Sequence, residues 1–166
     1  MFFLNGWLFS AFEFTAGVNW LYLPAGVRLL LVLMFGLSGA LGISVASATL
    51  SIALYAPNDP ITGLVAGVIT GFAPYLVQQL LQRFANLQNS LVNINAASLL
   101  QLTLLYAVAT SFGHQVWYVV RGVTDNFWLS VWPMFVGDLI GTVLVLYTGH
   151  AAVKLLRRSA AKRVAD

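Results

Sequence analysis

The sequence predicts an all-α membrane protein, a polytopic transmembrane bundle of about six helices. Of its 166 residues, 60% are hydrophobic and only 8% are charged, and the mean hydropathy is +0.85. A soluble domain carries roughly 25% charged residues, so this chain needs lipid as its solvent. A spanning helix takes about 20 mostly apolar residues, which allows five or six passes. We expect one transmembrane domain over residues 1–156 and a basic cytoplasmic tail over residues 157–166.

The first three predicted helices occupy the N-terminal third of the chain. Residues 2–20 have neither a basic leading region nor a cleavage motif of small residues, so we expect a retained helix rather than a signal peptide. The second helix, residues 25–37, is short and opens at Pro24, where the missing proline N–H would have no intrahelical partner anyway. The third, residues 39–56, ends at the turn pattern Pro-Asn-Asp-Pro of residues 57–60.

Three longer helices are predicted in the rest of the chain. They cover residues 61–84, 96–120 and 127–156, and Pro133 should kink the first turns of the last one. Residues 85–95 form an amide-rich connection between the first two. That connection is either a solvated interfacial loop or a contact surface for a soluble partner.

The basic residues predict the orientation of the bundle. Positive charge favours the cytoplasmic side of a membrane, so we expect both termini there and three loops outside, at residues 21–24, 57–60 and 121–126. Most of the tryptophans then fall at the outer interface, where amphipathic rings gather. The C-terminal basic residues are Lys154, Arg157, Arg158, Lys162 and Arg163, and the interfacial tryptophans are Trp20, Trp117, Trp128 and Trp132.

Four ionisable residues fall inside predicted spans: Glu13, Arg28, His114 and Asp138. Charge at membrane depth costs at least ~2.5–3.5 kcal/mol on insertion scales, so such residues are usually paired or functional. With a rise of about 1.5 Å per residue, all four lie within about 10 Å of the outer interface, on four helices. We expect a buried polar cluster in which Arg28 pairs with Asp138, Glu13 or both. Three interpretations stay open: an ion pair that only fixes helix register, a ligand or ion site, or a proton relay.

Glycines predict where helices approach closely. Small residues let helix backbones pack in lipid, where the hydrophobic drive between helices is weak. We favour packing within the chain over a dimer interface. The helix-packing stripe is Gly63, Gly67 and Gly71, and Gly137 and Gly141 flank Asp138.

Several classes of chemistry are not expected. The chain has no cysteine, which excludes disulfides and thiolate metal sites. It has no nucleophile–base pair, no phosphate-binding loop and no pair of metal ligands spaced along one helix, so we expect neither enzyme activity, nor metal, nor cofactor. The net charge of +3 is concentrated in the tail and does not indicate nucleic-acid binding.

Two stretches resemble a known family. Residues 20–28, Trp-Leu-Tyr-Leu-Pro-Ala-Gly-Val-Arg, and residues 132–142, Trp-Pro-Met-Phe-Val-Gly-Asp-Leu-Ile-Gly-Thr, are similar to motifs of MASE1-type integral membrane sensor domains. The resemblance implies a bacterial inner-membrane sensor. Family members commonly have about eight spans and a fused output domain. We expect about six spans and no output domain in this sequence, so a separate partner protein would carry the signal. The matching residues are Pro24, Ala25, Gly26, Gly137, Asp138 and Gly141.

Three functions follow as expectations. The first is a non-enzymatic sensor or regulatory module that binds a partner membrane protein or small ligand through the polar cluster. The second is an accessory subunit of a larger membrane complex, or a homo-oligomer. The third is a small-solute transporter subunit, because the short second helix between Pro24 and Gly36 resembles the interrupted helices of transporters.

Overall fold

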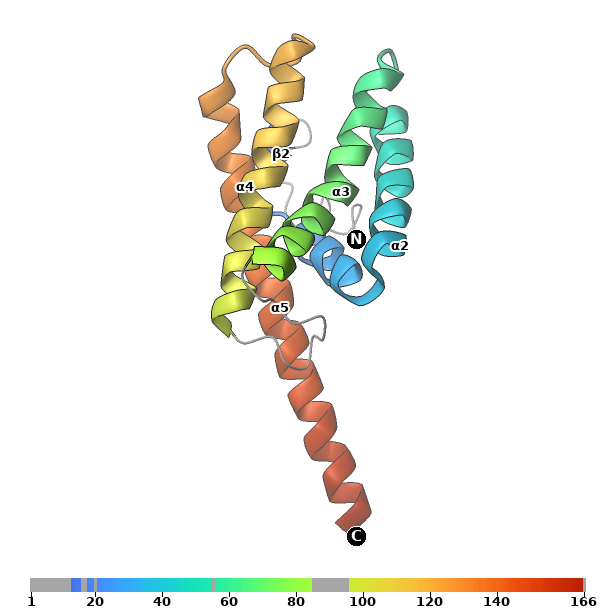
Figure 1. Cartoon of the computed structure of the whole chain (residues 1–166), viewed down its shortest axis with the longest axis vertical. Coiled ribbons are helices and arrows are strands. Elements are labelled where there is room, and N and C mark those ends of the chain that lie inside the picture. The colour runs from blue at the N-terminus through green and yellow to red at the C-terminus, as the bar shows by residue number, and fades with distance from the viewer. Residues whose placement is uncertain (1–12, 16–17, 20, 55, 85–95, 166) are drawn as a thin grey trace.

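The computed structural model describes residues 13–15, 18–19, 21–54, 56–84 and 96–165. In these residues the chain forms four helices, which pack together before the last one continues alone to the C-terminus (Figure 1). The α-helical fold class is confirmed, but six helices are not. The elements are β1 (Glu13–Thr15), β2 (Val18–Asn19), α2 (Leu23–Leu54), α3 (Pro60–Phe84), α4 (Ala96–Val120) and α5 (Phe127–Ala165).

The predicted first helix differs from the structure where it is described. Strands β1 and β2 pair antiparallel, with Glu13 opposite Asn19. Thr15 and Val18 are β-branched and fit extended backbone better than helix. The earlier part of that predicted helix, residues 1–12, lies outside the described residues.

The predicted second and third helices are the two legs of α2. They meet at Gly36, whose φ of 56° and ψ of −128° interrupt the helical backbone. Glycine adopts a positive φ without steric cost, so the chain changes direction there without a loop. A Cβ on Gly39 would lie 2.6 Å from the carbonyl oxygen of Leu31, which shows how tightly the two legs fold back on each other.

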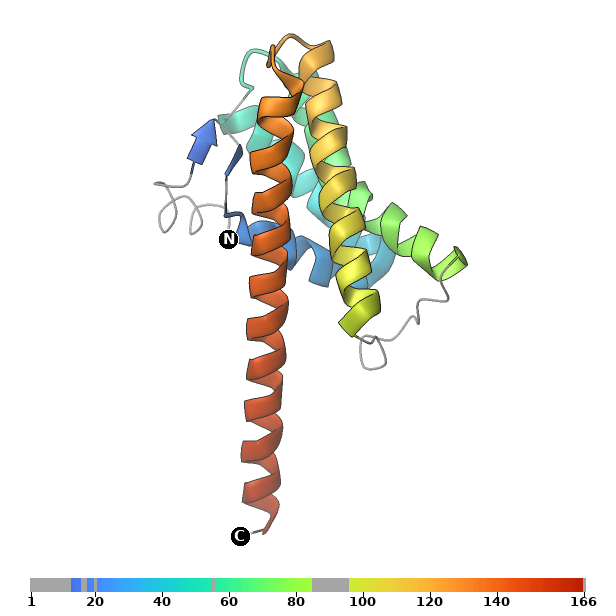
Figure 2. The same cartoon turned by 90° about the vertical axis from the view of Figure 1, so that its left-hand side faces the viewer.

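Helix α3 begins where its sequence favours a start. Asp59 precedes Pro60, the first helical residue, and its Oδ1 accepts a hydrogen bond of 3.2 Å from the backbone N–H of Thr62. An aspartate cap followed by proline is a favourable N-terminus. Pro74 lies inside the helix, and the C-terminal part of α3 runs away from the bundle axis (Figure 2).

The glycine stripe of α3 faces α2 of the same chain. A Cβ on any of its three glycines would collide with α2, so these positions allow the two backbones to approach closely. The contacts pair Gly63 with Ile52, Gly67 with Ala48, and Gly71 with Ser44.

The outside of the bundle is apolar and part of its inside is polar. Met34, Val45 and Leu76 are each more than 60% exposed. Three segments are long and apolar enough to cross a membrane: Leu23–Leu54, Pro60–Phe84 and Phe127–Gly149. A soluble protein has the opposite arrangement, with apolar side chains inside and polar ones outside. The apolar surface of this bundle suits lipid as the surrounding solvent. Helix α4 buries the polar side chains Thr103, Thr110, Ser111, His114 and Gln115.

Two of the three predicted outer loops lie at one end of the bundle. The α2–α3 and α4–α5 connections lie side by side at the end opposite the C-terminus (Figures 1 and 2). The third, residues 21–24, lies elsewhere. The N–H of Tyr22 donates to the carbonyl oxygen of Gly137 at 3.2 Å, and Gly137 is ten residues into α5, about 15 Å from its start. The start of α2 therefore lies midway along the bundle.

Candidate functional site

The candidate site is centred on Asp138 of α5. Its side chain is 2% exposed, and its Oδ2 has no hydrogen-bond partner among the described residues. One turn further along α5, the fully buried Thr142 also carries an unpartnered hydroxyl oxygen. A buried carboxylate is costly unless something compensates its charge and fills its lone pairs. Asp138 is therefore the residue of the bundle that most needs a partner.

Arg28 of α2 supplies the compensating charge at a distance. Its guanidinium interacts electrostatically with Asp138 and Tyr106. Between the described side chains, however, the only direct ion pair is at the loop end, between Arg121 and Asp59. The expected contact between Arg28 and Asp138 is thus not a direct ion pair.

The direct partner of the guanidinium is Tyr22. Arg28 Nη2 donates to the Tyr22 hydroxyl at 2.7 Å, and the guanidinium carbon lies 4.9 Å from the centre of the Tyr22 ring. A cation over an aromatic face is attracted by the ring quadrupole. Since Tyr22 lies six residues before Arg28, both contacts are made at the start of α2.

Tyr106 of α4 completes what we call the buried polar cluster: Tyr22, Arg28, Tyr106 and Asp138. Its side chain is fully buried, and its hydroxyl has no partner among the described residues. The groups that act on it are Asp138, Arg28, Tyr22 and the Thr110 side chain one turn further along α4, none of them at hydrogen-bond geometry. The cluster thus combines one cation, one carboxylate and two hydroxyls from α4, α5 and the start of α2. Tyr106 and Asp138 are buried, and Tyr22 and Arg28 are half-buried.

Close backbone contact between α2 and α5 makes this cluster possible. A Cβ on Gly141 would collide with the backbone of Tyr22, and a Cβ on Gly26 would lie 2.9 Å from the Cα of Thr142. The glycines of the two sequence motifs therefore allow the start of α2 to lie directly against the α5 segment that carries Asp138. Pro24 and Ala25, from the first motif, are buried at the same place.

His114 of α4 is tied to α3 instead. Its Nδ1 lies 2.8 Å from the carbonyl oxygen of Thr110, and its Nε2 lies 3.1 Å from Thr70 Oγ1 and 3.2 Å from the carbonyl oxygen of Ala66. Both ring nitrogens face a carbonyl oxygen that can only accept, and a neutral imidazole donates from one nitrogen. The Nδ1 contact with Thr110 is the shorter of the two, so we assign the proton to Nδ1, which leaves Nε2 to accept from the Thr70 hydroxyl. Arg28 still acts on His114 electrostatically. His114 therefore borders the cluster without being bonded into it.

The fourth predicted residue cannot be assigned to the cluster. Glu13 lies in strand β1, next to the start of α2 in sequence; its side chain lies outside the described part of the structure.

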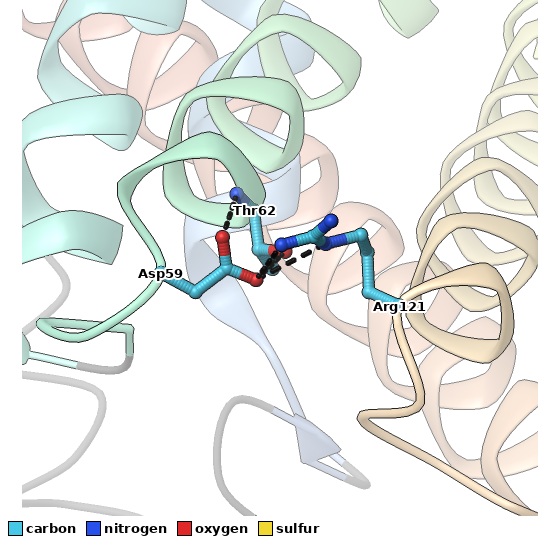
Figure 3. A network of polar contacts seen from close by, with 3 residues as sticks. All are labelled: Asp59, Thr62 and Arg121. Carbon is cyan, nitrogen blue, oxygen red and sulfur yellow. Dashed lines mark hydrogen bonds and ion pairs between the residues drawn. The ribbon is translucent and has the colours of Figure 1, made fainter.

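A second polar network, missed by the sequence analysis, lies at the loop end of the bundle (Figure 3). Arg121, at the end of α4, donates to Asp59 Oδ2 from Nε at 3.2 Å and from Nη2 at 2.9 Å. Thr62 Oγ1 donates to the same carboxylate oxygen at 2.6 Å. The Thr62 hydroxyl, and after it the Arg121 guanidinium, hold the pKa of Asp59 below its ordinary value. The Asp-Pro-x-Thr pattern could have predicted the helix cap, but not a partner 62 residues away.

These arrangements limit the chemistry of the site. In the described residues no group of three or more metal-binding side chains occurs. The buried polar cluster offers hydrogen-bond donors and acceptors with balanced charge, which suits binding and proton exchange better than covalent catalysis.

Comparisons with known proteins add no family. No protein-family model matches the chain, and neither a curated protein nor a solved structure is significantly similar to it.

Proposed function

We propose that the chain is a non-enzymatic sensor or regulatory module of the bacterial inner membrane, which binds a small polar ligand or a partner membrane protein through the buried polar cluster. One observation carries the proposal: Asp138 Oδ2 and the Tyr106 hydroxyl are both buried and unpartnered among the described residues. Buried polar atoms in folded proteins normally have partners, so two such atoms in one cluster favour a binding site.

The charges of the cluster favour a particular kind of ligand. Arg28 and Asp138 carry opposite formal charges, and each acts on the other through space. A ligand with net charge would leave one charge uncompensated in the interior, which is costly. A neutral or zwitterionic molecule can donate to Asp138 and accept from Tyr106 without that cost. In a complex with another membrane protein, a polar side chain of the partner would have the same role.

Helix α5 supplies the means of transmission. It carries Asp138 against the start of α2 and continues as one helix to Ala165. A ligand that moves α2 relative to α5 would therefore shift the whole length of α5, including the basic tail. We expect both termini to be cytoplasmic, so that a separate partner protein could detect this movement.

The proposal is tested by ligand-dependent unfolding of the full chain in lipid nanodiscs. Neutral and zwitterionic polar compounds, and candidate partner membrane proteins, are screened for an increase in unfolding temperature. A ligand present at 100 times its Kd should stabilise the chain by about 2.7 kcal/mol. Asp138→Asn should abolish that increase. Asp125→Asn, the same chemical change on an exposed loop residue, should retain it.

Two results would reject the proposal. One is a wild-type chain that responds to no compound and no partner. The other is a ligand whose stabilisation survives in Asp138→Asn as fully as in Asp125→Asn, because binding would then lie outside the cluster.

A second candidate, a small-solute transporter subunit, is favoured by the shape of α2. The helix starts midway along the bundle and is interrupted at Gly36. Interrupted helices that end near the membrane midplane form substrate sites in many transporters. Uptake of a defined solute into proteoliposomes, lost in Asp138→Asn, would support this function. An accessory subunit would instead co-purify at fixed stoichiometry with its complex in mild detergent.

A further inference from the structure

Polar side chains also lie in the bundle between the buried polar cluster and the loop end. We call Thr62, Thr70, Thr110, His114 and Gln115 the polar column. All five are at most 5% exposed. They extend from the first turn of α3, beside Asp59, to Thr110, which lies one turn of α4 beyond Tyr106. His114 joins the two helices through its contact with Thr70.

Threonine hydroxyls bonded to their own helix are common in membrane helices and need no further explanation. Thr110 is of that kind, since its hydroxyl donates to the carbonyl oxygen of Tyr106 at 2.8 Å. Two other features of the column are not explained by hydroxyls bonded to their own helix. The contact between Thr70 and His114 crosses from α3 to α4. Gln115, 1% exposed, donates from Nε2 to Met134 Sδ of α5 at 3.7 Å and leaves its Oε1 unpartnered among the described residues. Unsatisfied interior polar groups of this kind are where buried water binds.

The outer end of the column is closed by the ion pair of Figure 3. Asp59 lies between α2 and α3, and Arg121 at the end of α4, so their contact holds the two helical hairpins together. Thr62, the first member of the column, donates to the same Asp59 oxygen as Arg121 does. Both charged side chains are about one-third exposed, at 38% and 30%, so the pair can open to water.

We propose that the polar column is the access route by which water and small polar molecules reach Asp138 from the loop end, and that the Asp59–Arg121 pair is the latch at its entrance. This inference rests on the proposed binding function of the buried polar cluster. The route needs only small separations of α3 from α4, because polar groups already lie on both sides. An exposed ion pair is weak, so the latch opens readily and biases access rather than sealing the interior.

The chain has no cysteine, so a single introduced thiol reports access without interference. Thr70→Cys places the thiol inside the column, and Val68→Cys places it on the lipid-facing side of α3, where Val68 is 43% exposed. A charged, membrane-impermeant methanethiosulfonate is added to the full chain in nanodiscs. It reacts with the thiolate, forming a mixed disulfide and releasing methanesulfinate, so it labels sites that water reaches.

We expect Thr70→Cys to be labelled faster than Val68→Cys. Adding Arg121→Gln should raise the rate at Thr70→Cys about two- to five-fold, because it removes the latch and leaves Asp59 to cap α3. Asp125→Asn, at the same end of the bundle, should leave the rate unchanged. Thr110→Cys is a second column reporter if Thr70→Cys unfolds.

Equal labelling of the column and lipid-facing thiols would overturn the access route. A rate at the column thiol that Arg121→Gln does not change would overturn the latch. Neither outcome depends on a bound ligand. Failure of the access route therefore remains distinct from failure of ligand binding, which the unfolding experiment measures separately.

Discussion

The hydroxyl of Tyr22 accepts a 2.7 Å hydrogen bond from Arg28, while the guanidinium makes no direct ion pair with Asp138 among the described side chains. Tyr22 in turn is fixed by its backbone bond to Gly137, the residue just before Asp138. The same segment of α5 therefore orients Arg28 and presents the carboxylate. This geometry maintains two opposite charges near each other while leaving carboxylate and tyrosine oxygens available to a ligand.

The two tyrosines of the cluster should respond in opposite ways to loss of their hydroxyl. Tyr22→Phe removes an acceptor from a half-buried guanidinium, and hydrogen bonds to charged groups contribute about 1.5–3 kcal/mol, so the variant should unfold at lower temperature. Tyr106→Phe removes a buried hydroxyl that has no partner among the described residues. Its unfolding temperature should be unchanged or higher. Thermal unfolding in detergent compares the pair directly.

The stabilisation produced by a bound ligand should also differ between wild type and Tyr106→Phe. A ligand found by the unfolding screen should stabilise Tyr106→Phe less than wild type, although the unliganded variant is at least as stable. Destabilisation of Tyr106→Phe without ligand, as large as that of Tyr22→Phe, would mean that its hydroxyl is already satisfied in the folded chain.

The glycine contact between α2 and α5 predicts a large effect of a single methyl group. In Gly141→Ala the new Cβ would collide with the backbone of Tyr22, which cannot move as a side chain can. Overpacking of this kind costs about 1–3 kcal/mol. In Gly149→Ala nothing lies within 4 Å of the new Cβ, so the higher helix propensity of alanine should leave that variant as stable as wild type or slightly more stable. Equal unfolding temperatures for the two variants would contradict the contact.

The charged members of the cluster could be found from the sequence because a charge within an apolar span is conspicuous. Arg28 and Asp138 interact through space, but the predicted direct pair between them is not among the ion pairs of the described side chains. Tyr106 could not be found, since tyrosine is common in membrane helices and an unpartnered hydroxyl is a property of tertiary packing. His114 was predicted within the cluster, yet its ring nitrogens face Thr110 and α3. Nothing local in the sequence indicates which neighbour a buried imidazole contacts.

The sequence predicted helix boundaries best where a few neighbouring residues determine the backbone conformation. The Asp-Pro pair before α3 and the glycine near the bend of α2 both mark real boundaries. The predicted position of residues 21–24, at the outer end of the bundle, differs from the structure because the prediction placed every loop at a membrane interface. The first leg of α2 instead starts beside Gly137, and that position depends on a contact between segments more than 100 residues apart.

The latch at the loop end predicts a pH dependence with a definite sign. The pKa of Asp59 is lowered, first by the Thr62 hydroxyl and then by Arg121. A carboxylate of this kind contributes stability above its unfolded pKa of about 3.9, and the contribution is lost as the pH falls through the lower folded value. Thr62→Val should therefore raise the pKa of Asp59. Carbon NMR of labelled aspartate measures it, with Thr124→Val, a threonine whose hydroxyl pairs with Ser130, as control. A pKa of Asp59 unaffected by Thr62→Val would contradict the network of Figure 3.

The cross-helix contact of His114 predicts both a tautomer and a stability effect. Nδ1 lies 2.8 Å from the carbonyl oxygen of Thr110, closer than Nε2 lies to that of Ala66 at 3.2 Å, so Nδ1 should carry the proton and Nε2 should accept from Thr70. Nitrogen-15 NMR of the labelled imidazole distinguishes this tautomer from the Nε2-protonated one. Thr70→Val keeps the shape of the side chain but leaves Nε2 without its donor, which should cost about 1–3 kcal/mol.

A matched threonine separates that effect from a general loss of hydroxyls. Thr148 is exposed and bonds to carbonyl oxygens of its own helix, so Thr148→Val should leave the unfolding temperature almost unchanged. If Thr70→Val were equally harmless, the Thr70 hydroxyl would contribute nothing to the contact between α3 and α4, and His114 would meet α3 only through the Ala66 carbonyl. The polar column would then lose the only contact between described side chains that joins its members on α3 to those on α4, which would contradict its role as an access route to Asp138.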